Sequence, residues 1–156
     1  MSSWQQFAVE APALEETARA RFTATKHHVL ATLRRDGSPR VSGTEVQFHG
    51  DDLMAGSMPG AVKARDLQHD GRFALHANPG DGSMDGGDAK VSGRATEVTD
   101  TAELARYVGE VQPPEPFHLF RFDLDEVVVT SLHPDGDRLV IETWRPGRGV
   151  SRIERH

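Results

Sequence analysis

Apolar residues recur along the chain with two different periods, and the change of period divides the sequence into elements. In residues 13–25, Leu14, Ala18 and Phe22 follow at four-residue spacing with charged residues between them, which predicts an amphipathic helix. We therefore expect residues 1–25 to be an N-terminal helical segment. Beyond it the pattern changes to short β-prone runs, separated by turn formers such as RDGSP and HGDD.

These short runs predict most of the remaining fold. The predicted strands cover residues 28–33, 40–48, 53–57, 73–77, 89–98, 117–132 and 138–144. Helices are expected at 61–68 and after Thr99 or Asp100, where Glu103 suits a capping box. The Gly- and Asp-rich segment 78–88 has no apolar period and is predicted to be a mobile loop. Many short antiparallel strands with helices as connectors predict a mainly β, α+β barrel in one domain, residues 1–156.

Composition narrows the classes of function. The chain has 156 residues, a net charge of -6 and no cysteine. An acidic chain without clustered cations is a poor partner for nucleic acid, and the lack of cysteine excludes disulfides and thiolate metal sites. No apolar run has the length of a membrane helix, and the N-terminus lacks a basic region followed by an apolar one. We expect a cytoplasmic protein that interacts with neither nucleic acid nor membranes.

One stretch, LMAGSMPGAVKARDL, places cations where a helix begins after a strand. Lys63 falls in the predicted first turn, where backbone N–H groups are free to bind an anion. The Lys63 ammonium, the N–H groups of residues 60–62 and the Ser57 hydroxyl could converge on one phosphate. Solvated surface cations are the alternative, since a short stretch of this kind has weak specificity.

Other candidate sites are weaker. His27 and His28 are adjacent on a strand and point to opposite faces, so they cannot share a metal. The spacing of Asp81, Asp85 and Asp88 does not match a calcium-binding loop. There is no GxSxG elbow and no nucleophile and base at a recognisable spacing, which disfavours a hydrolase.

The order of motifs resembles the pyridoxamine 5'-phosphate oxidase-like family of FMN-binding split barrels. The resemblance spans residues 26–146 and is carried by HVLATLRRDGSPRVSGTEVQF, LMAGSMPGAVKARDLQHDGRFALH, AKVSGRATEV and ETWRPG. Its most specific element is the K-A-x-x-L pattern in KARDLQHDGRFAL. It implies a six-stranded antiparallel split β-barrel with flanking short helices, and a homodimer with FMN at the subunit interface.

The resemblance also assigns roles to particular residues. Lys63 takes the place of the family's phosphate-binding lysine, and Gly56 and Ser57 take strand positions that meet the phosphate and the ribityl chain. The family's Ser-Arg before that lysine is here Ala61-Val62, so Arg65 or Arg40 would replace the missing arginine. The strand RVSGTE would run along the flavin ring and present Ser42, Gly43 and Thr44. Further cofactor contacts are implied for Met58, Asp88 and Trp144.

The resemblance leaves several functions open. The chain lacks the C-terminal Arg-x-His segment that holds the substrate of true pyridoxamine phosphate oxidases, so that activity is not expected. Related split barrels bind a deazaflavin or haem. We expect an FMN-dependent oxidoreductase that transfers hydride between a nicotinamide and a small-molecule acceptor. The alternatives are a deazaflavin-dependent reductase and a non-catalytic module that binds flavin or haem.

Overall fold

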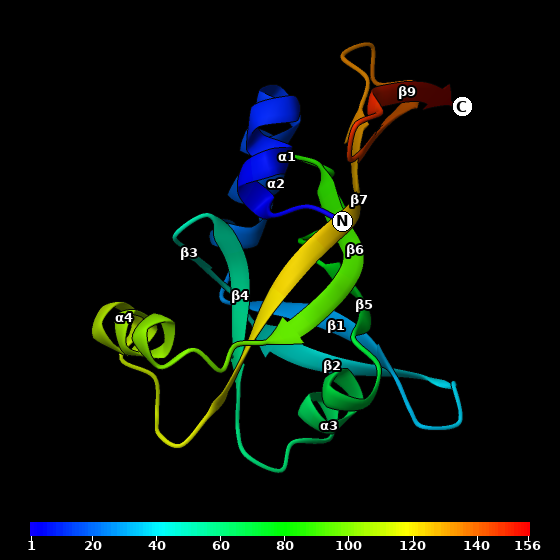
Figure 1. The fold of residues 1–156 in the computed structure, drawn as a ribbon. Coiled ribbons are helices and arrows are strands. Elements are labelled where there is room, and N and C mark those ends of the chain that lie inside the picture. The colour runs from blue at the N-terminus through cyan, green and yellow to red at the C-terminus, as the bar shows by residue number, and fades with distance from the viewer.

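The structure, a computed structural model, describes residues 1–156 and contains four helices and nine strands (Figure 1). The helices are α1 (Trp4–Glu10), α2 (Pro12–Ala24), α3 (Val62–His69) and α4 (Thr101–Val111). The strands are β1 (His27–Leu33), β2 (Pro39–Glu45), β3 (Gln47–His49), β4 (Asp52–Ser57), β5 (Arg72–His76), β6 (Asp88–Glu97), β7 (His118–Leu132), β8 (Leu139–Arg145) and β9 (Gly149–Arg155). This content confirms the mainly β, α+β class.

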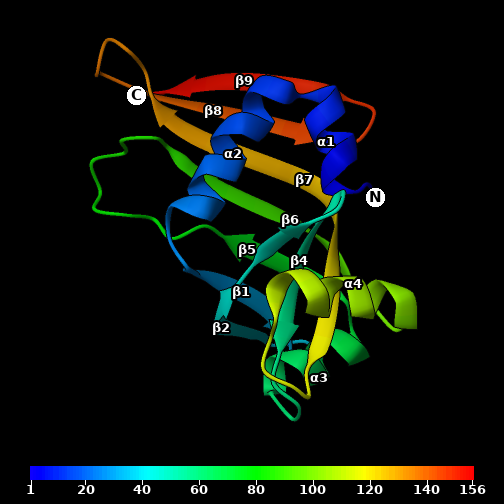
Figure 2. The ribbon, with the colours of Figure 1, turned by 90° about the vertical axis from the view of Figure 1, so that its left-hand side faces the viewer.

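All nine strands form one antiparallel sheet in the order β2-β1-β5-β6-β7-β4-β3, with β8 and β9 added along the far half of β7. The length of β7 explains this branching, because its first residues pair with β4 while its last residues pair with β8. As a result β8 and β9 lie at the opposite end of the molecule from α3 (Figures 1 and 2).

Helices cover the sheet at three places. The side chain of Ser3 caps α1, Pro12 begins α2, and both helices pack on the sheet near β6 and β7. Asp100 caps α4 as predicted, accepting a hydrogen bond from the Glu103 N–H. A core of 23 buried residues joins α1, α2 and α3 to the sheet, and a second cluster, with Tyr107, lies under α4. None of the four helices has the length and apolar composition of a transmembrane span.

Several sequence expectations need correction. The strand expected over residues 40–48 is divided at Val46 into β2 and β3. The helical segment expected over residues 1–25 consists of two helices, α1 and α2. The strand β9 was not expected, because its short segment carries too few apolar residues to show a period. The expected six-stranded barrel is a nine-stranded sheet, and its two end strands, β2 and β3, form no ladder with each other. Closure of a barrel is therefore not seen in the strand pairing.

The pairing of β6 with β7 changes register at a bulge between Ser92 and Gly93. A Cβ atom built on Gly93 would overlap the Asp123 carbonyl oxygen on the neighbouring strand. By contrast, a Cβ on Gly109, in the exposed part of α4, would meet nothing within 4 Å. Residue 93 therefore has no room for a side chain, whereas residue 109 does. Substituting the two glycines by alanine should change the stability of the protein in opposite directions.

We predict that Gly93→Ala lowers the free energy of unfolding by about 1 to 3 kcal/mol, because the added methyl overpacks the bulge. Gly109→Ala should raise it by about 0.5 to 1 kcal/mol, because alanine has the better helix propensity. Urea unfolding of both variants measures these changes. Equal effects would show that the close approach of β6 and β7 does not constrain residue 93.

Candidate functional site: a cavity between α3 and α4

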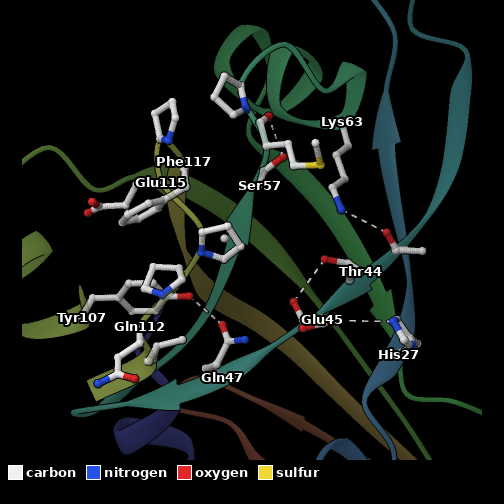
Figure 3. A pocket seen from close by; sticks show the side chains of 18 residues that line it. His27, Thr44, Glu45, Gln47, Ser57, Lys63, Tyr107, Gln112, Glu115 and Phe117 are labelled. Atoms are coloured by element: carbon white, nitrogen blue, oxygen red, sulfur yellow. Dashed lines mark hydrogen bonds and ion pairs between the residues drawn. The ribbon is translucent and has the colours of Figure 1, made fainter. Parts of the chain in front are cut away.

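A cavity of about 720 Å³ opens between two walls of the molecule (Figure 3). The first wall is β2 with the start of α3, and the second is α4 with the segment 112–117 that follows it. The end of β4 and the turn after it lie between the two walls. The lining residues are His27, Gly43, Thr44, Glu45, Gln47, Gly56, Ser57, Met58, Pro59, Lys63, Tyr107, Val111, Gln112, Pro113, Pro114, Glu115, Pro116 and Phe117. Its size is that of an ordinary small-molecule site.

Lys63 reaches into the cavity from the first turn of α3. The turn after β4 closes with a hydrogen bond from the Ala61 N–H to the Met58 carbonyl, and no side chain caps the helix that begins next. The N–H groups of Val62 and Lys63 therefore have no acceptor in the chain. The Lys63 Nζ donates to the Gly43 carbonyl at 3.0 Å, which joins α3 to β2. These groups form a donor set suited to an anion.

A buried carboxylate fixes the position of α3. Asp66 Oδ2 accepts hydrogen bonds from the Thr32 hydroxyl and from Arg40 Nε, both at 2.7 Å. Because Thr32 lies on β1 and Arg40 on β2, this one oxygen ties the helix to two strands. Arg40 is thereby engaged in holding the helix and does not line the cavity.

The opposite wall is positioned by Tyr107, which is almost completely buried on α4. Its hydroxyl donates to Gln47 Oε1 at 2.9 Å. A Cβ on Gly56 would lie 3.3 Å from this hydroxyl, so glycine leaves the room that the phenol occupies. A second contact, 2.7 Å between His49 Nδ1 and Glu110 Oε2, ties α4 to β3.

The ionisable groups of the cavity influence one another. Burial lowers the pKa of Lys63, and the negative charge of Glu45 opposes this shift. Burial also raises the pKa of the Tyr107 hydroxyl, and Glu45 adds to that effect. The carboxylate of Glu45 thus acts electrostatically on both walls, and Tyr107 remains a neutral hydrogen-bond donor at physiological pH.

The family model described as Pyridoxamine 5'-phosphate oxidase matches residues 14–131. This range contains both walls of the cavity and most of the sheet. The chain belongs to the pyridoxamine 5'-phosphate oxidase family. The match confirms the resemblance that the motifs around Lys63 indicate. No curated protein matches the chain.

Solved structures of this family share the fold at low sequence identity. An FMN-binding, pyridoxamine 5'-phosphate oxidase-related protein from Nostoc punctiforme has a TM-score of 0.65 and 13% identity, over 94% of this chain and 96% of that one. PhzG from Burkholderia lata, in complex with tetrahydrophenazine-1-carboxylic acid, has a TM-score of 0.58 and 15% identity, over 95% and 90%. The haem storage protein HutZ from Vibrio cholerae has a TM-score of 0.56 and 18% identity, over 77% and 94%. Members with this fold thus bind different ligands.

The cavity brings together most of the residues that the family resemblance selects. Those that line it are Gly43, Thr44, Gly56, Ser57, Met58 and Lys63. Ser42 lies on the inward face of β2 with Thr44, as the strand period predicts, but outside the lining. The exposed Arg65 lies beside Gly60, with its guanidinium 3.8 Å from the position of a Cβ there.

Two selected residues lie elsewhere. Trp144 is fully buried on β8, with its ring 4.9 Å from that of Phe7 and its indole N–H donating to Glu10 at 3.3 Å. It belongs to the core under α1 and cannot cover the cavity of its own chain. Asp88 begins β6 opposite Thr130, near the end of β7 that is farthest from α4. Within one chain, neither residue contributes to the site.

Sequence reasoning missed the second wall. Tyr107 and Phe117 come from a helix and a proline-rich segment with no family motif, although Tyr107 is the chain's only tyrosine. The one available signal was the proline-rich segment QPPEP, residues 112–116. All five of its residues line the cavity. Glu45 was visible at the end of RVSGTE, but only the fold shows that it faces this cavity.

Proposed function

We propose that the protein binds FMN in this cavity and is a flavin-dependent oxidoreductase. The observation that carries the proposal is the donor set at the start of α3, where the Lys63 side chain lines the cavity beside Gly43 and the N–H groups of Val62 and Lys63 have no acceptor. Ser57 lines the same space, and its hydroxyl makes only a long contact, 3.5 Å, to the Met58 carbonyl. These donors match the terminal phosphate of FMN.

The rest of the cavity suits the flat part of a flavin. Gly43 presents no side chain, and Thr44 offers a hydroxyl on the same wall. The apolar surfaces of Tyr107, Phe117 and the intervening prolines face them. Bound FMN would supply hydride transfer, between a nicotinamide and a small acceptor, while these residues hold and orient it and exclude water. FMN is preferred to a deazaflavin because the donors serve one phosphate and no further cations line the cavity.

We also propose that the chain forms a homodimer in the family's split-barrel arrangement. The outer faces of β1, β2 and β5 place Val29, Ala31, Val41 and Ala74 side by side. Val41 is 69% exposed and Val29 39% exposed, so this apolar surface has no cover in one chain. Gly43 lies on the same face of β2 as Val41, and it also lines the cavity. A second copy on this face would therefore adjoin the open side of the cavity.

Haem binding without turnover is the second candidate. His27 lines the cavity, and its side chain is 70% exposed, with a 3.4 Å contact from its Nε2 to Glu45. Imidazole is a common axial ligand of haem iron. The haem storage relative supports this alternative at the level of the family.

We predict that Lys63→Ala weakens FMN binding about ten- to a hundredfold, because it removes a charge-assisted hydrogen bond worth about 1.5 to 3 kcal/mol. Arg35→Ala is the matched control, since Arg35 is an exposed cation in the β1–β2 turn without an ion pair. Quenching of flavin fluorescence at matched salt measures both affinities.

Equal effects of the two substitutions would place the anion site away from α3. The same titration with a deazaflavin and with haemin tests the choice of cofactor. Binding of either one at least tenfold tighter than FMN would overturn that choice.

We predict that Val41→Asp weakens self-association at least tenfold, because a carboxylate would be buried without a partner in the interface. Val150→Asp, on the exposed β9, should leave the association unchanged. Sedimentation equilibrium over a concentration series measures both. A wild-type chain that is monomeric at micromolar concentration would contradict the dimer.

A further inference from the structure

One buried histidine joins three segments that lie apart in the sequence. His28, on β1, is only 2% exposed. Its Nε2 lies 3.0 Å from the Phe22 carbonyl oxygen near the end of α2, and its Nδ1 lies 3.0 Å from the backbone nitrogen of Asn78. Asn78 begins the glycine-rich loop between β5 and β6 (Figure 2). We propose that His28 is a pH-sensitive latch, which holds this loop while the imidazole is neutral and releases it when the imidazole takes up a proton.

The two backbone partners of His28 determine which ring nitrogen carries hydrogen. The Phe22 carbonyl can only accept, so Nε2 carries the hydrogen, and the Asn78 N–H can only donate, so Nδ1 keeps its lone pair. A proton taken from solvent would therefore go to Nδ1, and the new N–H would face the N–H of Asn78. Protonation breaks the bond to the loop and leaves the bond to α2 in place.

The loop has a second, weaker tie to α2. Arg21 donates to the carbonyl oxygens of Asn78 and Asp85, at 3.4 and 3.3 Å. Its Nε is buried without a hydrogen-bond partner, so the guanidinium is incompletely satisfied. Gly80 and Gly86 lie close to this guanidinium, since a Cβ atom on them would be 3.2 and 3.1 Å from it. Without the His28 bond, the start of the loop is held to α2 only by the long contacts of Arg21.

Release of the loop exposes little apolar surface. None of residues 79–86 is buried. The side-chain hydrogen bonds inside the loop join close neighbours, from the Gly80 N–H to Asn78 Oδ1 and from the Ser83 N–H to Asp81 Oδ1. Segments with few buried apolar contacts open at a lower free energy than global unfolding requires. Protonation of His28 should therefore open the loop locally and leave the sheet intact.

The surroundings of His28 keep its imidazole neutral at physiological pH. Burial lowers the pKa of His28 more than its hydrogen bond to the Phe22 carbonyl raises it, and the charge of His27 lowers it further. The folded chain therefore resists protonation, whereas the opened loop allows it. The latch is closed at neutral pH and weakens as the pH falls below the ordinary pKa of histidine, about 6.5.

No acidic group is placed to stabilise a protonated His28. Its cross-strand partner on β2 is the uncharged Thr44, and His76 on β5 lies on the other face of the sheet. Arg21 on α2 is itself a cation, and its charge acts on Asp81 in the loop. The loop carboxylates are exposed, and His28 forms no ion pair with them. A positive charge on the buried ring would thus be relieved by opening the loop to water.

Hydrogen exchange of the Asn78 amide measures this latch directly. It is followed by NMR on the full-length protein between about pH 7.5 and about pH 5, a range that spans the ordinary pKa of histidine. The protection factor, which corrects for the intrinsic effect of pH on exchange, should fall about tenfold for each pH unit below about 6.5 until the lowered pKa of His28 is reached. The amides of β7 that pair with β6 should keep their protection.

Variants of His28 separate titration from packing. His28→Phe keeps an aromatic ring but removes the acceptor, so the Asn78 amide should already be unprotected at neutral pH. His28→Asn keeps an acceptor near the position of Nδ1 but does not titrate, so the protection should no longer depend on pH. His69→Asn, at an exposed histidine in the last turn of α3, is the matched control and should leave the pH profile unchanged.

Circular dichroism confirms that each variant is folded, and the wild-type profile with His28→Asn decides if the phenylalanine variant is not. The latch is overturned if the protection of Asn78 does not depend on pH, or if the amides of β7 lose protection together with it. A pH dependence that persists in His28→Asn would assign the titration to another group and would also overturn it. These outcomes do not bear on the proposed function, because His28, Arg21 and Asn78 lie outside the cavity.

Discussion

The buried carboxylate of Asp66 is the contact on which the site depends. Asp66 lies on α3 and accepts hydrogen bonds from the Thr32 hydroxyl on β1 and from the Arg40 guanidinium on β2. A buried charge is stable only when it is paired, so these bonds fix the helix against both strands. The start of α3 then faces Gly43, and Lys63 can reach across to β2. Without this anchor the hydrogen-bond donors at the start of α3 would have no fixed position relative to β2.

The opposite wall depends on long-range contacts of another kind. The Tyr107 phenol occupies the space beside Gly56 and bonds to Gln47, while His49 holds the far end of the same helix. Two independent anchors therefore set the width of the cavity. The same scaffold can accept different ligands if the lining residues change, which agrees with the range of ligands among relatives of similar fold.

Local patterns were enough to predict one wall of the site. The strand period places Ser42 and Thr44 on one face, and the turn before the helix places Lys63 in its first turn. The other wall could not be predicted, because Tyr107 meets Gln47 across 60 residues and no local period records that contact. For Trp144, by contrast, the sequence suggested a place in the site, whereas the structure places the residue in the core. A C-terminal tryptophan suggested a cover for the cofactor, but helix α1 packs against it and buries it, so it cannot cover the cavity of its own chain.

Riboflavin is the sharpest probe of phosphate binding at the start of α3, because it differs from FMN only in lacking the phosphate. Affinities of both flavins should be measured for the wild type and for Lys63→Ala in one thermodynamic cycle. The wild type should bind FMN at least tenfold more tightly than riboflavin, about 1.4 kcal/mol, and most of this difference should disappear in the variant. Equal affinities for the two flavins in the wild type, or a preference for FMN that survives the substitution, would contradict phosphate binding at the start of α3.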